Sequence, residues 1–293
     1  MPELPETETI ARDLHAMIVG TTVRDVVVHR PDVLRETSAE ALRAALRGAA
    51  SGAPTRATDA MRFVRAWRRA KLIVMDLATD LQEDASWHLV VQPRFTGGLV
   101  VDDGSLPEEE LAYVCVTLHL ADDRRLHYRD VRRLGTVTLM SPARFQAYSA
   151  GLGPEPLDPA LDAATFSGLL RSSRQPIKVT LMDQRRLAGV GNIYANEALW
   201  RAGIDPSREA RTLQESETTR LLQALREVLA ASIAARGTSF RDYRDARGER
   251  GTFVEQLAAY GRGGEPCARC GRRLVVTHAI DGRSTVFCPG CQF

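Results

Sequence analysis

Residues 151–159 read Gly-Leu-Gly-Pro-Glu-Pro-Leu-Asp-Pro and separate two halves of the chain that follow different patterns. Three prolines in nine residues cannot continue a helix or a strand, so the sequence predicts a linker here. Short strand-like runs precede this linker, and helical patterns follow it. We therefore expect an α+β protein whose halves fold as separate parts.

The half before the linker predicts one helix and then a series of strands. Pro2 lies at the helix start, acidic residues fill the first turns, and apolar residues recur at helical spacing as far as Gly20. We expect a two-sheet β-sandwich or flattened barrel with this helix packed on it. Short β-branched runs bounded by turn residues mark its strands, at 23–28, 72–75, 99–101 and 136–139.

The half after the linker predicts helices and a small terminal module. From about residue 261 the chain is rich in Gly and Cys and too short to form a core unaided. Helical periodicity covers 163–172, 177–184, 193–202 and 215–235. The predicted parts are a β-sandwich domain at 1–145, a linker at 146–160, a helical domain at 161–260 and a zinc finger at 261–293.

Four of the five cysteines form two C-x2-C pairs that are seventeen residues apart, namely Cys267, Cys270, Cys288 and Cys291. Two such pairs bring four thiolates to the corners of a tetrahedron, which is the arrangement of a closed structural zinc site. Disulfides are the alternative, and a redox pair would need a βαβ context that is absent. We predict one structural Zn²⁺ and expect Cys115, in an apolar run, to lie in the core.

Bulk composition describes an ordinary globular chain of 293 residues. No apolar stretch approaches the length of a membrane span. Glu3, Glu6 and Glu8 occupy the place where a secretory signal would carry basic and then apolar residues. We therefore expect a cytoplasmic protein without membrane association.

The formal net charge of +2 does not by itself indicate nucleic acid, but the basic residues are clustered. Clusters at 56–71, 124–133 and 262–273 would suit a phosphate backbone, although basic loops on a solvated surface are also common. Only Lys71 and Lys178 are lysines among the 39 basic residues. Either the composition favours arginine, or these two positions need an ammonium group.

The chain start has two interpretations. Initiator methionine is readily removed before proline, which would leave Pro2 as a free secondary amine able to form an iminium with an aldehydic carbon. The positive end of the helix dipole disfavours its ammonium form, and Glu3 is close enough to move protons. The alternative is that proline and nearby acids are ordinary helix-start residues.

Residues 281–285, Asp-Gly-Arg-Ser-Thr, predict a hairpin tip between the cysteine pairs. A bound metal would make this hairpin rigid, so that Arg283 could be presented to a phosphate. A solvated turn arginine is the alternative.

Several segments taken together resemble the bacterial formamidopyrimidine-DNA glycosylases, in the order of that family and over essentially the whole chain. The resemblance implies a bifunctional glycosylase and lyase of base excision repair, acting as a monomer on damaged double-stranded DNA in the bacterial nucleoid. The matching segments are 1–10, 152–157, 182–184 with 188–199, 236–243, 260–262, the four cysteines, 282–285 and 287–289.

The same resemblance implies roles for residues near the chain start. Pro2 would attack the sugar C1′, and Glu3 would act as the general acid and base beside it. Glu6 would help to hold the active-site helix and the lesion pocket. Lys71 matches a lysine that contacts phosphate near the lesion and assists catalysis.

Three residues of the second half are implied to meet DNA. Asn192 begins the second helix of a helix–two-turn–helix element, where exposed N–H groups suit a phosphate oxygen. Arg283 matches the zinc-hairpin arginine that binds phosphates flanking the everted nucleotide. Lys178 precedes the helical element and is also expected to face DNA.

The chain departs from the family at the residues that fill the gap left by an everted base. Phe95 stands where the family has methionine, and Leu134 stands where it has phenylalanine, while Arg132 is kept. A stacking aromatic has therefore moved across the intercalation site, either as a neutral exchange of wedge side chains or as the mark of a divergent subfamily with altered lesion choice. We expect the wedge function to be kept. Residues 241–252 match the lesion-capping loop without a clear assignment of base contacts.

The leading hypothesis is excision of oxidised purines such as 8-oxoguanine and formamidopyrimidines, followed by β,δ-elimination. One alternative keeps the mechanism but prefers oxidised pyrimidines, as the endonuclease VIII branch does. Another is a lesion or abasic-site binder without catalysis, and a zinc-ribbon transcription module would account only for the last thirty residues or so.

Overall fold

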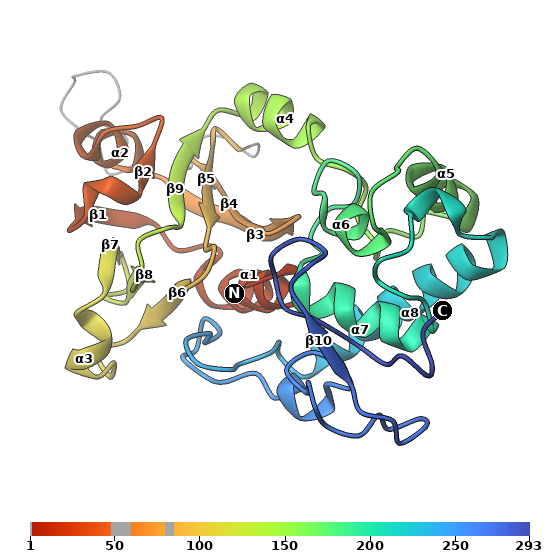
Figure 1. Cartoon of the computed structure of the whole chain (residues 1–293). Helices are drawn as coiled ribbons and strands as arrows, with labels where there is room; N and C mark the ends of the chain where they lie inside the picture. Colours follow the sequence, from red (N-terminus) through yellow and green to blue (C-terminus); the bar gives the residue numbers. More distant parts are fainter. Residues whose placement is uncertain (1, 48–59, 80–84) are drawn as a thin grey trace. The chain divides into compact units, whose positions relative to one another are not determined.

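The structure is a computed structural model, and it describes residues 2–47, 60–79 and 85–293. Met1 and the Arg56 to Asp59 part of the first basic cluster lie outside the described residues. The chain divides into two compact units (Figure 1). Unit 1 comprises residues 1–150 and 236–251, and unit 2 comprises residues 151–235 and 252–293.

Unit 1 contains two sheets. The four-stranded sheet has the order β1-β7-β8-β6, and the five-stranded sheet has the order β2-β9-β5-β4-β3. All neighbouring strands pair antiparallel except β2 and β9. The strands are β1 (Val23–Val28), β2 (Leu34–Arg35), β3 (Arg62–Arg69), β4 (Leu72–Ala78), β5 (Trp87–Gln92), β6 (Gly97–Asp102), β7 (Val114–Leu120), β8 (Arg125–Asp130) and β9 (Thr136–Met140).

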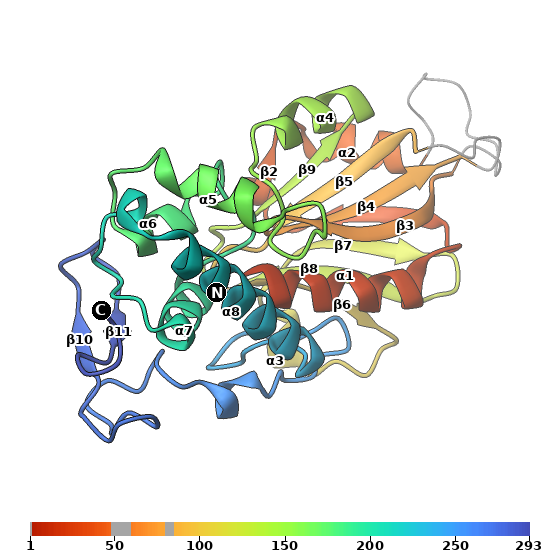
Figure 2. The same cartoon turned by 90° about the vertical axis from the view of Figure 1, so that its right-hand side faces the viewer.

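Helix α1 (Leu4–Ile18) packs on β3 and β4 of one sheet and on β6 of the other. Ile10, Leu14 and Ile18 recur at i, i+4 and i+8, which places them on one helix face, and all three are fully buried. They join apolar residues of both sheets in one core. Figure 2 shows α1 running alongside the strands of unit 1. The predicted β-sandwich with a packed first helix is confirmed. Short helices complete unit 1, namely α2 (Ala39–Leu46), α3 (Glu108–Leu111), α4 (Pro142–Ala150) and the 3-10 turn Pro31–Val33.

Residues 236–251 follow the long helix of the second half, yet they belong to unit 1. Tyr243 and Ala246 enter the same core as α1. The Val101 N–H donates to the Ala246 carbonyl at 2.9 Å, which attaches the segment to β6. The expected helical domain at 161–260 included this segment; the structure differs because two apolar side chains and a backbone bond hold it on the β-sandwich.

Unit 2 is mainly helical, as expected. Its helix α7 packs against α6, α8 and β11, and α5 packs against α8. Asp162 caps α5 by accepting from Thr165 N at 2.7 Å, and Gly203 ends α7 with φ of 70°. The elements are α5 (Ala163–Arg171), α6 (Ile177–Met182), α7 (Asn192–Ala202), α8 (Glu215–Ala234), 3-10 turns at Ala210–Thr212 and Phe253–Gln256, β10 (Val275–Thr277) and β11 (Thr285–Phe287).

Within the described ranges, every helix is too short or too polar to cross a membrane.

Phe63 on β3 is fully buried in the unit 1 core, so its truncation tests that core. We expect Phe63→Ala to lower the free energy of unfolding by about 3–5 kcal/mol, because the lost transfer energy adds to that of a cavity. Val19→Ala at a side chain that is 36% exposed should change it by less than about 0.5 kcal/mol. Equal denaturant midpoints for the two variants would contradict this assignment of the core.

Candidate active site and nucleic-acid interface

The start of α1 brings three predicted residues together. Pro2 is buried, and Glu3 and Glu6 are each only 1% exposed. The Glu3 N–H donates to Glu6 Oε2 at 2.8 Å, and the Thr238 N–H donates to Glu6 Oε1 at 2.8 Å. Both Glu6 oxygens therefore have backbone donors, which offsets the cost of burying this carboxylate. Pro2, the Glu3 carboxylate beside it and the Glu6 carboxylate that fixes the helix start therefore lie in one place.

Lys71 lies in the tight turn between β3 and β4. The preceding residue, Ala70, has φ of 54°, and Lys71 is half-buried. The two strands pair directly up to the turn, since Arg69 is opposite Leu72. The antiparallel ladder thus fixes the backbone from which the Lys71 ammonium extends.

Phe95 and Arg132 are neighbours although they lie in different loops. The Arg132 N–H donates to Oγ1 of Thr96, the residue after Phe95, at 3.0 Å. The Arg132 guanidinium lies 5.0 Å from the centre of the Phe95 ring, a cation–π distance. Phe95 is 46% exposed and Leu134 is 42% exposed, which is unusual for side chains of this size. The structure therefore presents an aromatic, a cation and an aliphatic side chain on the surface of unit 1.

Asp130 holds the two loops that carry these side chains. It is 1% exposed and accepts from Thr96 Oγ1, from Tyr128 Oη at 3.1 Å and from Gly135 N at 2.8 Å. Burial, and next the Asp130 charge, raise the pKa of Tyr128 well above its usual range, so that its hydroxyl remains a donor. Gly135 has no room for a side chain, because a Cβ would lie 2.6 Å from the Gln92 carbonyl oxygen.

The hairpin between β10 and β11 carries Arg283, which is exposed. The Asn192 side chain donates to the Ser284 carbonyl at 3.0 Å, and so the first residue of α7 touches the residue next to Arg283. The Arg283 N–H donates to Asp281 Oδ1 at 3.1 Å, which shapes the turn. The structure thus brings Asn192 and Arg283 together within unit 2.

Lys178 does not lie where it was expected. Its side chain is completely buried, and Nζ donates to Asp281 Oδ1 at 3.1 Å and to Thr285 Oγ1 at 2.8 Å. The expectation that it faces DNA is therefore corrected, because the ammonium is withdrawn from the surface into the base of the hairpin. The Lys178 ammonium thereby joins Asp281 and Thr285, the residues on either side of the turn that carries Arg283.

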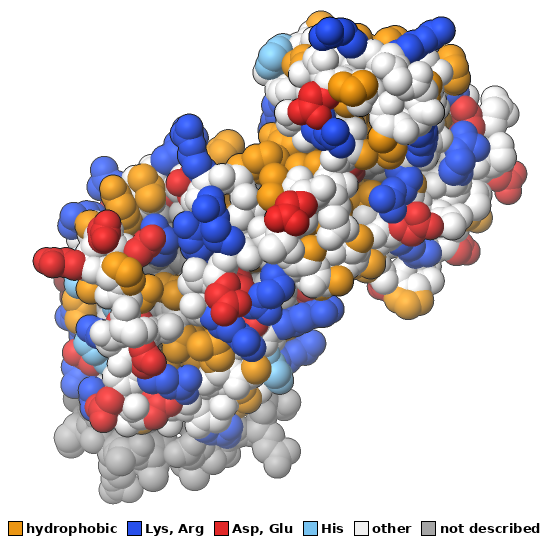
Figure 3. Space-filling model, turned by 90° about the horizontal axis from the view of Figure 1, so that it is seen from below, with side chains coloured by type: hydrophobic (Ala, Val, Ile, Leu, Met, Phe, Trp, Pro, Cys, Tyr) orange, Lys and Arg blue, Asp and Glu red, His pale blue; other side chains and the backbone are white. Residues whose placement is uncertain are grey.

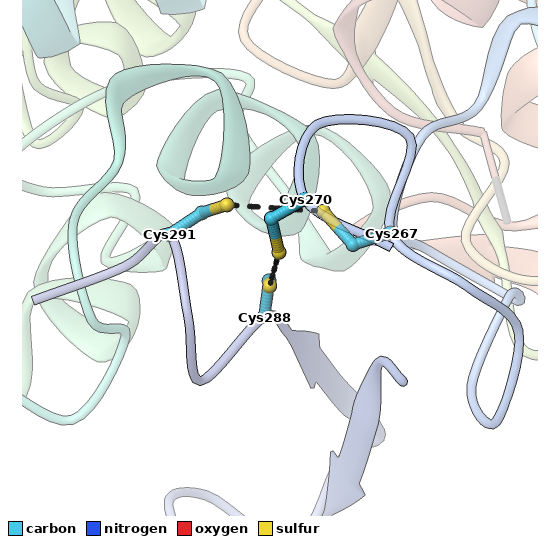
Figure 4. A group of neighbouring side chains, drawn as sticks. All are labelled: Cys267, Cys270, Cys288 and Cys291. Carbon is cyan, nitrogen blue, oxygen red and sulfur yellow. Dashed lines mark hydrogen bonds between the residues drawn. The ribbon is translucent and has the colours of Figure 1, made fainter. Parts of the chain in front are cut away.

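The four predicted cysteines converge in unit 2 (Figure 4). Their sulfur atoms all lie within 4.8 Å of one another, with Cys267 to Cys291 at 4.0 Å and Cys270 to Cys288 at 3.5 Å. Four sulfurs each about 2.3 Å from a tetrahedral zinc ion would be about 3.8 Å apart. The donor set and its spacing fit a closed structural Zn²⁺ site, and the zinc prediction is confirmed to this extent.

The small module around the cysteines has little apolar core of its own. Cys267, Cys288, Leu274 and Val286 pack with Trp200 of α7 and Ala259. The Arg269 guanidinium stacks 4.2 Å from the Trp200 ring centre. With so few apolar contacts, a bound Zn²⁺ would supply the crosslink that holds the hairpin.

Most arginines of the predicted basic cluster at 124–133 have acidic partners. Figure 3 shows basic and acidic side chains intermixed on the visible face. This cluster is therefore largely neutralised locally, which favours the solvated-surface alternative for it. The ion pairs are Arg124 with Asp122, Arg125 with Asp102, Arg129 with Glu110 and Arg133 with Asp32.

Sequence reasoning missed a buried ionic group beside α1. Arg236 donates from Nε to Asp245 Oδ2 at 2.8 Å and from a terminal nitrogen to Asp13 Oδ2. Asp245 is fully buried and Asp13 is 5% exposed. Asp13 lies three residues after Ile10 on the apolar side of the helix, and a buried acid there was the available signal of a cationic partner.

Family models match nearly the whole chain. The formamidopyrimidine-DNA glycosylase N-terminal domain matches residues 1–137, the formamidopyrimidine-DNA glycosylase H2TH domain matches 152–244, and a zinc finger found in FPG and IleRS matches 264–292. The chain belongs to the formamidopyrimidine-DNA glycosylase family. This membership confirms the expected fold class and the prediction of a DNA glycosylase with a zinc finger.

Relatives of the formamidopyrimidine-DNA glycosylase family agree over the full length. The proteins of Desulfitobacterium hafniense strain DCB-2 and Heliobacterium modesticaldum are each 40% identical, with 100% of both chains covered. Solved structures of the Lactococcus lactis family member, one with DNA containing an abasic site and one with DNA containing N7-benzyl-Fapy-dG, are 32% identical. Each has a TM-score of 0.85 and 99% coverage of both chains.

Metal removal should act on the hairpin of unit 2 and spare unit 1. We expect one zinc per chain by elemental analysis, because the four sulfurs form one cluster. Cys288→Ala, which removes a fully buried ligand, should lower zinc content and weaken duplex binding. Cys115→Ala removes the fifth, buried thiol and should leave zinc content unchanged. Full zinc occupancy in Cys288→Ala would contradict the four-sulfur site.

Proposed function

We propose that this protein is a bifunctional DNA glycosylase and lyase that excises oxidised purines from duplex DNA through its N-terminal proline. The observation that carries the proposal is the buried start of α1, where Glu3 directly follows Pro2 and the nearby Glu6 carboxylate accepts from Glu3 N and Thr238 N. Solved complexes of the Lactococcus lactis relative with DNA that contains an abasic site and with DNA that contains Fapy-dG support DNA as the substrate class.

The proposed chemistry begins at the imino nitrogen that is exposed when Met1 is removed. The positive end of the α1 dipole disfavours the ammonium form, which leaves more neutral nucleophile near pH 7. This nitrogen attacks the sugar C1′ and loses its proton, while the bond from C1′ to the base breaks and the base leaves as its protonated form. Glu3 then protonates the ring oxygen as the bond from C1′ to that oxygen opens. The resulting iminium acidifies the C2′ proton, and successive β- and δ-elimination releases the DNA on both sides.

Residues of both units are proposed to hold the duplex. Lys71 and Arg283 would contact phosphates near the lesion, and Asn192 would do so at the start of α7, where N–H groups point outward. The helices of unit 2 and the zinc finger at 261–293 would supply most of this grip. We further propose that the protein acts as a monomer at the bacterial nucleoid, where its substrate is.

Phe95, Arg132 and Leu134 are proposed to fill the space left by the everted base. Their exposure and the stacking of Arg132 on Phe95 support this role, because apolar and planar side chains replace lost base stacking. Unstacking a base costs a few kcal/mol, which such a wedge offsets in part. Preference for oxidised purines over oxidised pyrimidines follows the family resemblance and is part of the proposal.

A borohydride trap tests the covalent step. Wild-type protein with a trimmed N-terminus, verified by intact mass, should give a reduced adduct with an abasic-site duplex, and peptide mapping should place it on Pro2. Protein that keeps Met1 should give none, because its proline nitrogen is an amide. Glu3→Gln should slow base release by about 10²–10⁴-fold, the usual range for loss of a general acid.

Controls separate the competing functions. An adduct that maps to Lys71 instead of Pro2 would reassign the nucleophile, and no adduct with any oxidised or abasic duplex would leave only a DNA-binding role. Parallel single-turnover rates on duplexes with 8-oxoguanine and with thymine glycol test the lesion preference. Faster release of thymine glycol would favour the oxidised-pyrimidine alternative.

Arg283 has a separate test that does not depend on catalysis. Arg283→Ala should weaken binding to an abasic-analogue duplex and reduce the slope of log K against log salt by about 1, because one phosphate contact is lost. Arg24→Ala, at an exposed arginine paired with Asp123, is the matched control and should leave the slope unchanged. An unchanged slope in Arg283→Ala would exclude a direct phosphate contact.

A further inference from the structure

The segment at 236–251 is attached to α1 by two sets of contacts, one ionic and one through the backbone. The ionic set joins Arg236 to Asp13 of α1 and to Asp245 of the segment itself. The backbone set joins Thr238 N to the Glu6 carboxylate. Arg236 and Thr238 are two residues apart, so the position of the guanidinium limits where the Thr238 N–H can lie.

Both carboxylate oxygens of Asp245 accept hydrogen bonds from other residues of the segment at 236–251. Oδ2 accepts from Arg236, while Oδ1 accepts from the N–H groups of Arg247 and Glu249, each at 2.9 Å. The residue is fully buried. A buried charge of this kind fixes its partners, because any rearrangement would leave it without compensation.

The backbone between Arg236 and Thr238 is confined as well. Arg236 has φ of 61° and Gly237 has φ of 88°, so two consecutive residues adopt the left-handed conformation. A Cβ at position 237 would lie 2.9 Å from the Tyr243 ring and 3.1 Å from Glu6 Cγ. Tyr243 Oη donates to the Arg236 carbonyl at 3.1 Å and is 3.4 Å from the Glu6 carbonyl. The turn therefore fits tightly against the Glu6 side chain.

We infer that Asp245 and Asp13, acting through Arg236, are positioning residues that fix the Glu6 carboxylate and thereby the Glu3 backbone and the adjoining Pro2. The path runs from the Arg236 ion pairs through Gly237 and Thr238 to Glu6 Oε1, and from Glu6 Oε2 to Glu3 N. It rests on the proposed function, in which Pro2 is the nucleophile. The segment thus acts on the reaction even when the substrate contains no base to cap.

The segment at 236–251 can affect the reaction by covering a damaged base or by positioning the start of α1, and the two roles have different consequences. A segment that only covers a damaged base would affect base excision and leave strand cleavage at a ready-made abasic site unchanged. A segment that positions the start of α1 affects both reactions, since both use the same nitrogen. Lyase activity on a duplex with a preformed abasic site is therefore the deciding measurement.

Asp245→Asn is the informative variant, because Asn keeps an acceptor for the two backbone N–H groups but loses the charge that faces Arg236. We expect the single-turnover lyase rate and the rate of borohydride trapping to fall about 10-fold to 100-fold, as a small displacement of a nucleophile allows. The Kd for the abasic duplex should remain within about twofold. Asp123→Asn, at a side chain that is 84% exposed, is the matched control and should match wild type.

A second variant and a double variant keep the test decisive. Tyr243→Phe removes only the hydroxyl at the turn and should slow trapping by a smaller factor in a protein that keeps its packing. The effects of Asp13→Asn and Asp245→Asn should be less than additive in the double variant, because both carboxylates pair with Arg236 and Asp13 pairs in addition with Arg247 of the same segment. Measured melting temperatures will show that all variants are folded at the assay temperature.

The outcomes separate this inference from the proposed function. If wild type gives no adduct, the proposed function fails. If wild type traps normally and Asp245→Asn does so at the same rate, the positioning role is overturned. Slower excision of 8-oxoguanine with unchanged lyase activity in Asp245→Asn would also overturn the positioning role, because the segment would then act only on the damaged base.

Discussion

The Glu6 carboxylate is almost fully withdrawn from water, and it accepts hydrogen bonds from two backbone N–H groups, one nearby in the chain and one distant. One donor comes from the residue after Pro2 and the other from Thr238. Because a buried charge without such donors would be strongly unfavourable, helix α1 and the segment at 236–251 must be placed together. The geometry of the candidate active site depends on this single group.

In unit 2 the buried charged group is an ammonium, and it too is compensated by hydrogen-bond partners within the protein. Lys178 is buried with its ammonium on Asp281 and Thr285, and Asp281 in turn orders the turn that carries Arg283. The four thiols add a metal crosslink to a module with few apolar residues. The exposed Arg283 therefore extends from a turn that ion pairing and the metal hold rigid, which would lower the entropy cost of the phosphate contact proposed for it.

In the two loops that carry the exposed Phe95 and Leu134 side chains, the backbone is held by groups other than these side chains. Asp130 anchors both loops from below through side-chain and backbone donors, and its bonds do not involve the side chains at the tips. Exchange of an aromatic and an aliphatic residue between the tips therefore leaves the support unchanged.

Local pattern was sufficient for much of this protein. The period of apolar residues in α1, the β-branched strands, the prolines at 151–159 and the spacing of the cysteines are each determined within a few residues, so the sequence alone predicted them. Tertiary structure alone decided three other features. These are the burial of Lys178, the packing of residues 236–251 in unit 1 and the ion pairs of Arg236. Each of these joins residues about 100 or more positions apart, or buries a charge that local sequence expects at the surface. No local pattern records which partner will satisfy such a charge.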